Sequence, residues 1–218
     1  EKIRIEGIDI NIRNTPFSFG IKYLLTKNPE LYEEPERILI GALKPGDQVL
    51  ELGSSIGILT RLIAHKISPG GKIIAVEADA KLTDFSKTWL EKQPNIKVLN
   101  GLALPLYRHL PIRAFFDDTQ GSLGGRLIFE NENQSGKGEN CLFLEDIEKA
   151  HQFKPNVLVC DIEGSEILIL DHGVDFPLYL NVIIIELHPS IYSLGKTLQI
   201  INKIRDGGFE LHSSLMSV

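Results

Sequence analysis

Between residues 48 and 100, short apolar segments alternate with longer ones whose apolar residues recur at helical spacing. This pattern predicts strand 48–52, helix 57–67, strand 72–76, helix 80–92 and strand 96–100. It resumes near residue 145 and predicts helix 145–152, strand 156–161, helix 164–171, strand 181–187, helix 194–206 and strand 208–214. Because such alternation with short turns favours parallel pairing, we expect an α/β fold: a doubly wound, mostly parallel sheet with helices on both faces.

Two parts of the chain depart from this alternation. Alternating isoleucines around Glu6-Gly7 predict that residues 1–34, an N-terminal extension, begin with a hairpin and continue into a short helix. Strand-like pieces at 112–117, 123–130 and 140–144 predict an antiparallel β insertion within residues 103–145. Since neither a repeat nor a linker divides the chain, we expect residues 1–218 to form one domain, with the extension and the insertion shaping the substrate pocket.

Composition narrows the range of partners. The net charge is −6 and no basic cluster stands out, which argues against a nucleic-acid surface. The longest strongly apolar stretch, 182–185, is strand-sized and far too short to span a membrane. Cys141 and Cys160 are too few for a disulfide scaffold and lack the spacing of metal ligands. We therefore expect a cytoplasmic protein without nucleic-acid or membrane partners; the sequence does not indicate an oligomeric state.

The first predicted strand leads into a turn that contains glycines. Glu51 lies near the end of this strand, and Gly53 and Gly57 follow before the helix. A dinucleotide fingerprint from Gly53 would need glycines at 55 and 58, where the chain has Ser55 and Ile58. The spacing instead leaves room for an amino-acid-like group, with Glu51 near its ammonium. A tight strand–helix turn without a ligand is the alternative.

The next two strand ends extend this hypothesis. Glu77 lies 24 positions after Gly53 (77 − 53), near the spacing at which an acidic residue binds ribose hydroxyls in nucleotide folds. A solvated strand end, or a helix cap shared with Asp79, would also explain Glu77. Leu102 closes the third strand, where it would face an adenine through a backbone contact or apolar packing. An ordinary strand end explains Leu102 equally well.

The apolar strand 156–161 runs directly into three carboxylates, those of Asp161, Glu163 and Glu166. Glu163 and Glu166 could be explained as capping residues of the next helix, because acidic side chains stabilise a helix N-terminus. Capping does not require Asp161 at the end of the strand, where the binding crevice of such sheets opens. His188 follows the next strand and is expected at the mouth of the same crevice.

The motifs Asp161-x-Glu163-Gly164-x-Glu166 and Glu186-Leu187-His188-Pro189 resemble the FkbM-type methyltransferase family. Lys44-Pro45-Gly46-Asp47, Val76-Glu77-Ala78-Asp79 and Gly101-Leu102-Ala103-Leu104 fit in the same order, so the resemblance covers roughly residues 35–210. It implies a Rossmann-like class I fold and an S-adenosylmethionine-dependent O-methyltransferase that acts on hydroxyls of sugars or natural products. The implied cofactor-binding residues are Glu51, Gly53, Ser54, Ser55, Gly57, Glu77, Ala78, Leu102 and Asp161.

The chain departs from the family pattern at two places around the glycine-containing turn after strand 48–52. Glu51 replaces a common Asp, and Ser54-Ser55 replaces a common Ala-Asn, so a contact from that Asn side chain is lost or altered.

An alcohol acceptor needs help in losing its proton. We therefore expect Asp161 and His188 to be catalytic, one as the base and the other orienting it, with Glu163 in reserve. Mg²⁺ held by Asp161, Glu163 and His188 is an alternative arrangement. Two other functions stay open: a nicotinamide-dependent oxidoreductase, against which the missing glycines count, and a non-catalytic scaffold that binds the cofactor.

Overall fold

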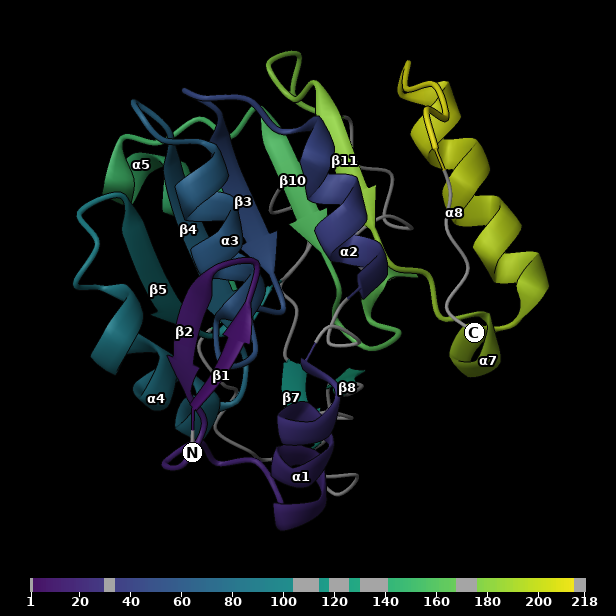
Figure 1. The fold of residues 1–218 in the computed structure, drawn as a ribbon. Coiled ribbons are helices and arrows are strands. Elements are labelled where there is room, and N and C mark those ends of the chain that lie inside the picture. The colour runs from purple at the N-terminus through teal and green to yellow at the C-terminus, as the bar shows by residue number, and fades with distance from the viewer. Residues whose placement is uncertain are drawn as a thin grey trace.

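The computed structural model describes residues 2–29, 34–103, 114–117, 126–129, 141–167 and 176–213. Its centre is a five-stranded sheet in the order β11-β10-β3-β4-β5, in which every neighbouring pair is parallel (Figure 1). The strands are β3 (Gln48–Leu52), β4 (Lys72–Glu77), β5 (Ile96–Asn100), β10 (Val157–Cys160) and β11 (Val182–Ile185). This confirms the predicted parallel sheet, with strand bounds within about two residues of the predicted ones.

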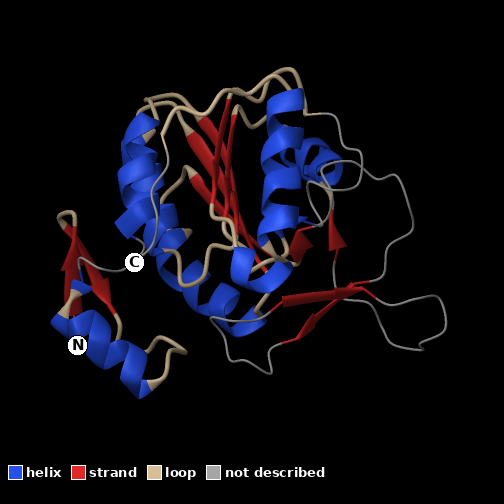
Figure 2. Ribbon diagram, turned by 90° about the vertical axis from the view of Figure 1, so that its right-hand side faces the viewer, coloured by secondary structure: helices blue, strands red, loops and turns tan. Residues whose placement is uncertain are grey.

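Helices cover both faces of this sheet, because consecutive strand residues point to opposite sides. Val49 belongs to one apolar core and Leu50 to the other. The first core includes residues of α2 (Glu34–Leu39), α3 (Ile58–Lys66) and α4 (Ala80–Leu90), and the second includes residues of α5 (Leu144–His151) and α8 (Leu194–Asp206). The chain is therefore doubly wound, as predicted. Figure 2 shows the sheet between its two layers of helices.

The N-terminal extension packs into the first core. Strands β1 (Lys2–Ile5) and β2 (Ile8–Asn11) form the predicted antiparallel hairpin. The short helix that follows is α1 (Phe19–Lys27), where the hydroxyl of Ser18 accepts a hydrogen bond from the amide of Ile21. Ile5 and Ile12 are fully buried in the same core as α3. The 3₁₀ helix η2 (Ile40–Ala42) continues α2.

The insertion is only partly as predicted. Strands β7 (Ala114–Asp117) and β8 (Arg126–Phe129) are antiparallel, but β9 (Cys141–Leu142) pairs in parallel with β6 (Leu102–Ala103). The predicted antiparallel pairing is therefore confirmed for β7 and β8 but is wrong for β9. A parallel pair needs a crossover of a dozen or more residues, and the chain between β6 and β9 is long enough to supply it.

The prediction of a last strand over residues 208–214 is also wrong for the residues that the structure describes. Residues 208–213 form no strand, and the ring of Phe209 instead packs edge-on against Phe176 with centroids 5.2 Å apart. A short helix that was not predicted, α7 (Pro189–Tyr192), precedes α8. Residues 168–171, the second half of the helix expected over 164–171, fall outside the described residues, whereas residues 166 and 167 are helical. Among the helices that the structure describes, none has the length and apolar character needed to cross a membrane.

Candidate functional site

The sheet reverses its direction of winding between β3 and β10. The chain proceeds outward from β3 through β4 to β5 and then returns to place β10 on the other side of β3. In open α/β sheets, ligands bind beyond the carboxyl ends of the strands at such a switch point. Leu52 is opposite Cys160, which in turn is opposite Ile185. The residues that follow, which include Gly53, Asp161 and Glu186, therefore reach the same edge of the sheet.

The glycine turn after β3 is shaped by contacts within the protein. Gly53 has φ +86°, and a Cβ there would lie 1.6 Å from the backbone oxygen of Asp161. Gly57 also has φ +86°, and its Cβ would lie 2.2 Å from Cδ1 of Leu90 in α4. Both positions thus require glycine for packing as well as for backbone conformation, a requirement that the sequence pattern did not separate from the close approach of a ligand.

Two polar side chains beside this turn keep unsatisfied atoms. Glu51 is 1 % exposed, and its Oε2 accepts a hydrogen bond of 2.6 Å from Oγ1 of Thr60. Within the described residues, Oε1 of Glu51 and Oγ of the buried Ser54 have no hydrogen-bond partner. Burial, with a smaller contribution from Glu77, raises the pKa of Glu51 to about 8. Because unpaired buried polar atoms are costly, these two atoms suit a hydrogen-bonding or cationic ligand group.

Glu77 links the first turn to the end of β4. Its Oε2 accepts from the amide of Ser55 at 2.7 Å, and its Oε1 accepts from the amide of Asp79 at 2.8 Å. Ser55 has φ +50°, so the turn presents this amide from a left-handed conformation. Burial raises the pKa of Glu77 to about 7. The structure therefore brings Gly53, Ser55 and Glu77 together, as the hypothesis of one nucleoside site requires.

Two more of the predicted cofactor contacts, Ala78 and Leu102, lie near the end of β4. The carbonyl of Ala78 accepts a hydrogen bond of 3.0 Å from the side-chain amide of Asn100, which closes β5. Leu102 is fully buried in β6. Its burial is compatible with the apolar packing that the sequence suggested, and its contact with an adenine stays a prediction.

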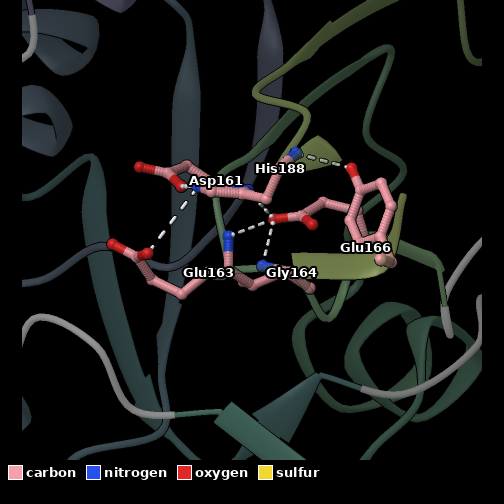
Figure 3. A network of polar contacts seen from close by, with 7 residues as sticks. Asp161, Glu163, Gly164, Glu166 and His188 are labelled. Atoms are coloured by element: carbon pink, nitrogen blue, oxygen red, sulfur yellow. Dashed lines mark hydrogen bonds and ion pairs between the residues drawn. The ribbon is translucent and has the colours of Figure 1, made fainter. Parts of the chain in front are cut away.

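The predicted catalytic residues gather around the ring of His188 (Figure 3). Nε2 lies 3.8 Å from Oδ1 of Asp161 and 3.6 Å from Oε2 of Glu163. On the other side of the ring, Nδ1 lies 3.2 Å from Oε1 of Glu166. The sequence motifs that follow β10 and β11 therefore form one cluster of carboxylates around a single imidazole.

Glu166 is the buried member of this cluster and is fully inaccessible. Its Oε1 accepts hydrogen bonds from the amides of Ile162 at 2.9 Å and Gly164 at 3.3 Å. Gly164 has φ +92°, and a Cβ there would lie 2.7 Å from Ile191 of α7. The two amide hydrogen bonds fix the carboxylate in the turn after β10, whereas the capping interpretation from the sequence did not include its contact with His188.

His188 is held from its backbone as well as from its ring. Its amide donates a hydrogen bond of 2.7 Å to the hydroxyl of Tyr192, and Pro189 begins α7 directly after it. The carboxylate of Glu166 is the main cause of the raised pKa of His188. The pKa of Asp161 is raised mainly by burial and then by the charges of Glu186 and Glu163.

Two further acids at this site were missed as functional residues. Glu186 directly follows β11 and, with Asp161 and His188, offers ligand atoms that all lie within 4.8 Å of one another. Glu36 of α2 is buried, and burial followed by the charge of Glu186 raises its pKa. Glu186 could have been predicted from the sequence, because it directly follows an apolar strand. Glu36 could not, because only the packing of α2 brings it to the cluster.

Residues 32–102 match the family model of protein-L-isoaspartate (D-aspartate) O-methyltransferase. The chain is 40 % identical over 70 residues to a probable ribosomal RNA small subunit methyltransferase A of Methanosarcina acetivorans, covering 32 % of this chain and 25 % of that protein. It is 34 % identical over 101 residues to the ribosomal RNA small subunit methyltransferase A of Alkaliphilus metalliredigens, covering 46 % and 32 %. The chain thus spans a quarter to a third of the length of these relatives.

Among solved structures, the fibrillarin pre-rRNA processing protein of Methanococcus jannaschii aligns with a TM-score of 0.52 at 14 % identity. The alignment covers 98 % of this chain and 74 % of that protein. This similarity shows a shared Rossmann-like fold. The matched family and both curated relatives are methyltransferases. The family match ends at residue 102 and so includes the glycine turn and Glu77 but not the cluster around His188.

Proposed function

We propose that this chain, which has the fold of the class I S-adenosylmethionine-dependent methyltransferases, methylates a hydroxyl of a small molecule such as a sugar or natural product. The observation that carries the proposal is the common edge of the sheet at which the glycine turn, Glu77 and the cluster around His188 meet. The resemblance of the 161–166 and 186–189 motifs to the FkbM-type family supports the choice of an oxygen acceptor.

The cofactor fits the first half of the site. The unsatisfied atoms of Glu51 and Ser54 suit the amino-acid end of S-adenosylmethionine, and Glu77 suits the ribose hydroxyls. Leu102 supplies an apolar contact beside the adenine. These residues all fall within the segment that matches the methyltransferase family model.

When bound, S-adenosylmethionine supplies a methyl group on a sulfonium sulfur, which is already activated for transfer. The work left to the chain is to hold the acceptor oxygen in line with that group, to exclude water and to remove the hydroxyl proton. Asp161 and His188, whose Oδ1 and Nε2 lie 3.8 Å apart, are the groups that would receive this proton. Glu163 lies beside them as a second carboxylate. Glu166 holds the ring of His188 from the opposite side.

The relatives suggest a second candidate, because the two curated ones are named as ribosomal RNA methyltransferases. Their similarity extends over 70 and 101 residues, so more than half of this chain lies outside it. The cluster of Asp161, Glu163, Glu166 and Glu186 would repel the phosphates of a nucleic acid. We therefore favour the small hydroxylated acceptor, and RNA and isoaspartyl peptides serve as competing acceptors in the test.

The first experiment asks which cofactor binds. Calorimetric titration with S-adenosylmethionine and with NAD distinguishes a methyltransferase from an oxidoreductase, and we expect binding of S-adenosylmethionine alone. Methyl transfer is then followed with radiolabelled cofactor on three acceptor sets: hydroxylated small molecules, ribosomal RNA fragments and isoaspartyl peptides. Label in the first set supports the proposal. Label only in RNA or peptide would replace it, and cofactor binding without label in any set would favour a scaffold.

The second experiment tests the residues. Asp161→Asn and His188→Ala should each lower turnover by about 100-fold or more while cofactor binding stays within a few-fold of the unaltered chain. Glu210→Gln is the matched control, because Glu210 is exposed and lies beyond α8. If Asp161→Asn and His188→Ala both keep near-normal turnover while they still bind cofactor, the assignment of the base is wrong.

A further inference from the structure

We propose that Asp161, Glu186 and His188 form a binding site for one divalent cation at the acceptor end of the sheet. One ligand atom from each residue lies within 4.8 Å of the other two. Six-coordinate Mg²⁺ binds its ligands at about 2.0–2.1 Å, so adjacent ligand atoms lie about 3 Å apart and opposite ones about 4 Å. The three side chains therefore need only small rotations to bind one ion. The site itself stands without the proposed function, whereas its role in catalysis rests on that function.

A second observation comes from the far side of the imidazole. Glu166 is fully inaccessible, and two backbone amides fix its Oε1 3.2 Å from Nδ1 of His188. The ring N–H is not aligned well enough for a hydrogen bond, but the buried carboxylate still favours a proton on Nδ1. In the neutral ring, Nε2 is then the nitrogen that carries the lone pair, and it faces Asp161 and Glu163. A histidine that binds a metal through one ring nitrogen almost always directs the other to a carboxylate or carbonyl in this way.

The balance of charge at the cluster also favours a cation. The part of the chain that the structure describes brings no lysine or arginine within ion-pair distance of Asp161, Glu163 or Glu166. Within that same part, Oδ1 of Asp161 is buried without a hydrogen-bond partner. A divalent ion would satisfy this oxygen and offset the repulsion among the acids. Two carboxylates with one imidazole suit Mn²⁺ or Mg²⁺ better than a thiophilic metal.

The cation would change how the acceptor is handled. A hydroxyl oxygen bound to a divalent ion loses its proton more readily, so Asp161 and His188 would hold the acceptor through the ion. Glu163 is absent from the cation-binding set, and its side chain is 43 % exposed. It is therefore the carboxylate left to accept the proton. In this arrangement, Glu166 is a positioning residue that acts through His188.

The test measures cation binding directly, without cofactor or acceptor. The full chain is treated with a chelator and titrated with Mn²⁺, and free Mn²⁺ is followed by electron paramagnetic resonance. We expect one ion per chain. Asp161→Asn, Glu186→Gln and His188→Ala should each weaken binding by at least about 10-fold, and Glu166→Gln by about 10- to 100-fold. The exposed residues His65 and Glu210 supply the controls, since His65→Ala and Glu210→Gln should bind as the unaltered chain does.

Each outcome decides a separate point. Absence of stoichiometric Mn²⁺ binding, or binding that survives all three ligand substitutions, overturns the cation site. Thermal unfolding supplies a readout that needs no variant: an unaltered chain whose Tm does not rise with Mn²⁺ also overturns it. Calorimetric titration with S-adenosylmethionine on the same samples tests the proposed function independently. Mn²⁺ binding without cofactor binding would keep the site and discard the function, and the reverse result would keep the function and discard the site.

Discussion

The α-carbon of Gly53 faces the backbone oxygen of Asp161 so closely that a Cβ on Gly53 would lie 1.6 Å from it. The amide of Asp161 in turn donates a hydrogen bond of 3.0 Å to the carbonyl of Leu52. These contacts join the ends of β3 and β10, which flank the switch point of the sheet. The glycine turn and the carboxylate cluster are therefore held together by backbone contacts, independently of any ligand.

Substitution of Gly53 should separate these two strand ends. Gly53→Ala adds a methyl group that overlaps a backbone oxygen, so we expect the free energy of unfolding to fall by more than about 4 kcal/mol. Gly46→Ala is the control, because Gly46 has φ +93° but no atom of the described residues lies within 4 Å of the position that its Cβ would take. The free energy of unfolding of Gly46→Ala should fall only by the cost of holding alanine in the left-handed conformation, about 1–2 kcal/mol. Urea unfolding measures both, and equal losses would contradict the contact.

Replacement of Glu77 should weaken cofactor binding. Its carboxylate accepts amide hydrogen bonds from Ser55 and Asp79 and is the acid expected at the ribose. A hydrogen bond to a charged group contributes about 1.5–3 kcal/mol, so we expect Glu77→Ala to raise the Kd for S-adenosylmethionine at least about 10-fold. Asp79→Asn is the control, because asparagine keeps the helix cap that Asp79 provides. A Kd that stays the same in Glu77→Ala would remove Glu77 from the binding site.

The raised pKa of Glu51, about 8 in the folded chain against 4.5 ordinarily, should appear as a pH dependence of stability. Below about pH 4.5, Glu51 is protonated in both states and contributes no difference. As the pH rises toward 8, the unfolded chain releases this proton while the folded chain keeps it. The free energy of unfolding therefore falls, by at most about 1.4 kcal/mol per pH unit. Above pH 8, the contribution levels off.

Glu51→Gln removes the titrating group. The free energy of unfolding of this variant, relative to that of the unaltered chain, should therefore increase between pH 5 and 8. Urea unfolding at several pH values measures the difference. Glu91→Gln is the control, because the ion pair with Lys97 lowers the pKa of Glu91 and its contribution is lost only as the pH falls. A difference between Glu51→Gln and the unaltered chain that does not change with pH would contradict the burial of a protonated Glu51.

The contact between Glu166 and His188 can be tested in the metal-free chain. The carboxylate of Glu166 is the main cause of the raised pKa of His188, so Glu166→Gln should lower that pKa. Nuclear magnetic resonance of the imidazole protons, followed against pH, measures the shift. Glu210→Gln should leave the titration of His188 unchanged. If Glu166→Gln also leaves it unchanged, the two side chains are not in contact in solution.

Local patterns in the sequence were sufficient for most of the sheet. The periodicity of apolar residues predicted β3, β4 and β5 and located α8 at its observed bounds. The same reasoning failed for β9 and for residues 208–213, because short segments at the edge of a fold take their partners from distant parts of the chain. No local pattern specifies that β9 pairs in parallel with β6. The same holds for the candidate site. Local sequence patterns pointed to Asp161, Glu163 and His188 but not to Glu36.

The sequence by itself determined the alternation of strands and helices, the residues at each strand end and thus the set of acids available at one edge of the sheet. Tertiary structure alone decided which of them meet. It placed Glu166 against Nδ1 of His188, directed Nε2 toward Asp161 and Glu163, and made Gly53 necessary for packing rather than only for a turn. The physical reason is that periodicity records which face of an element is buried, while distances between side chains depend on how separate elements pack together.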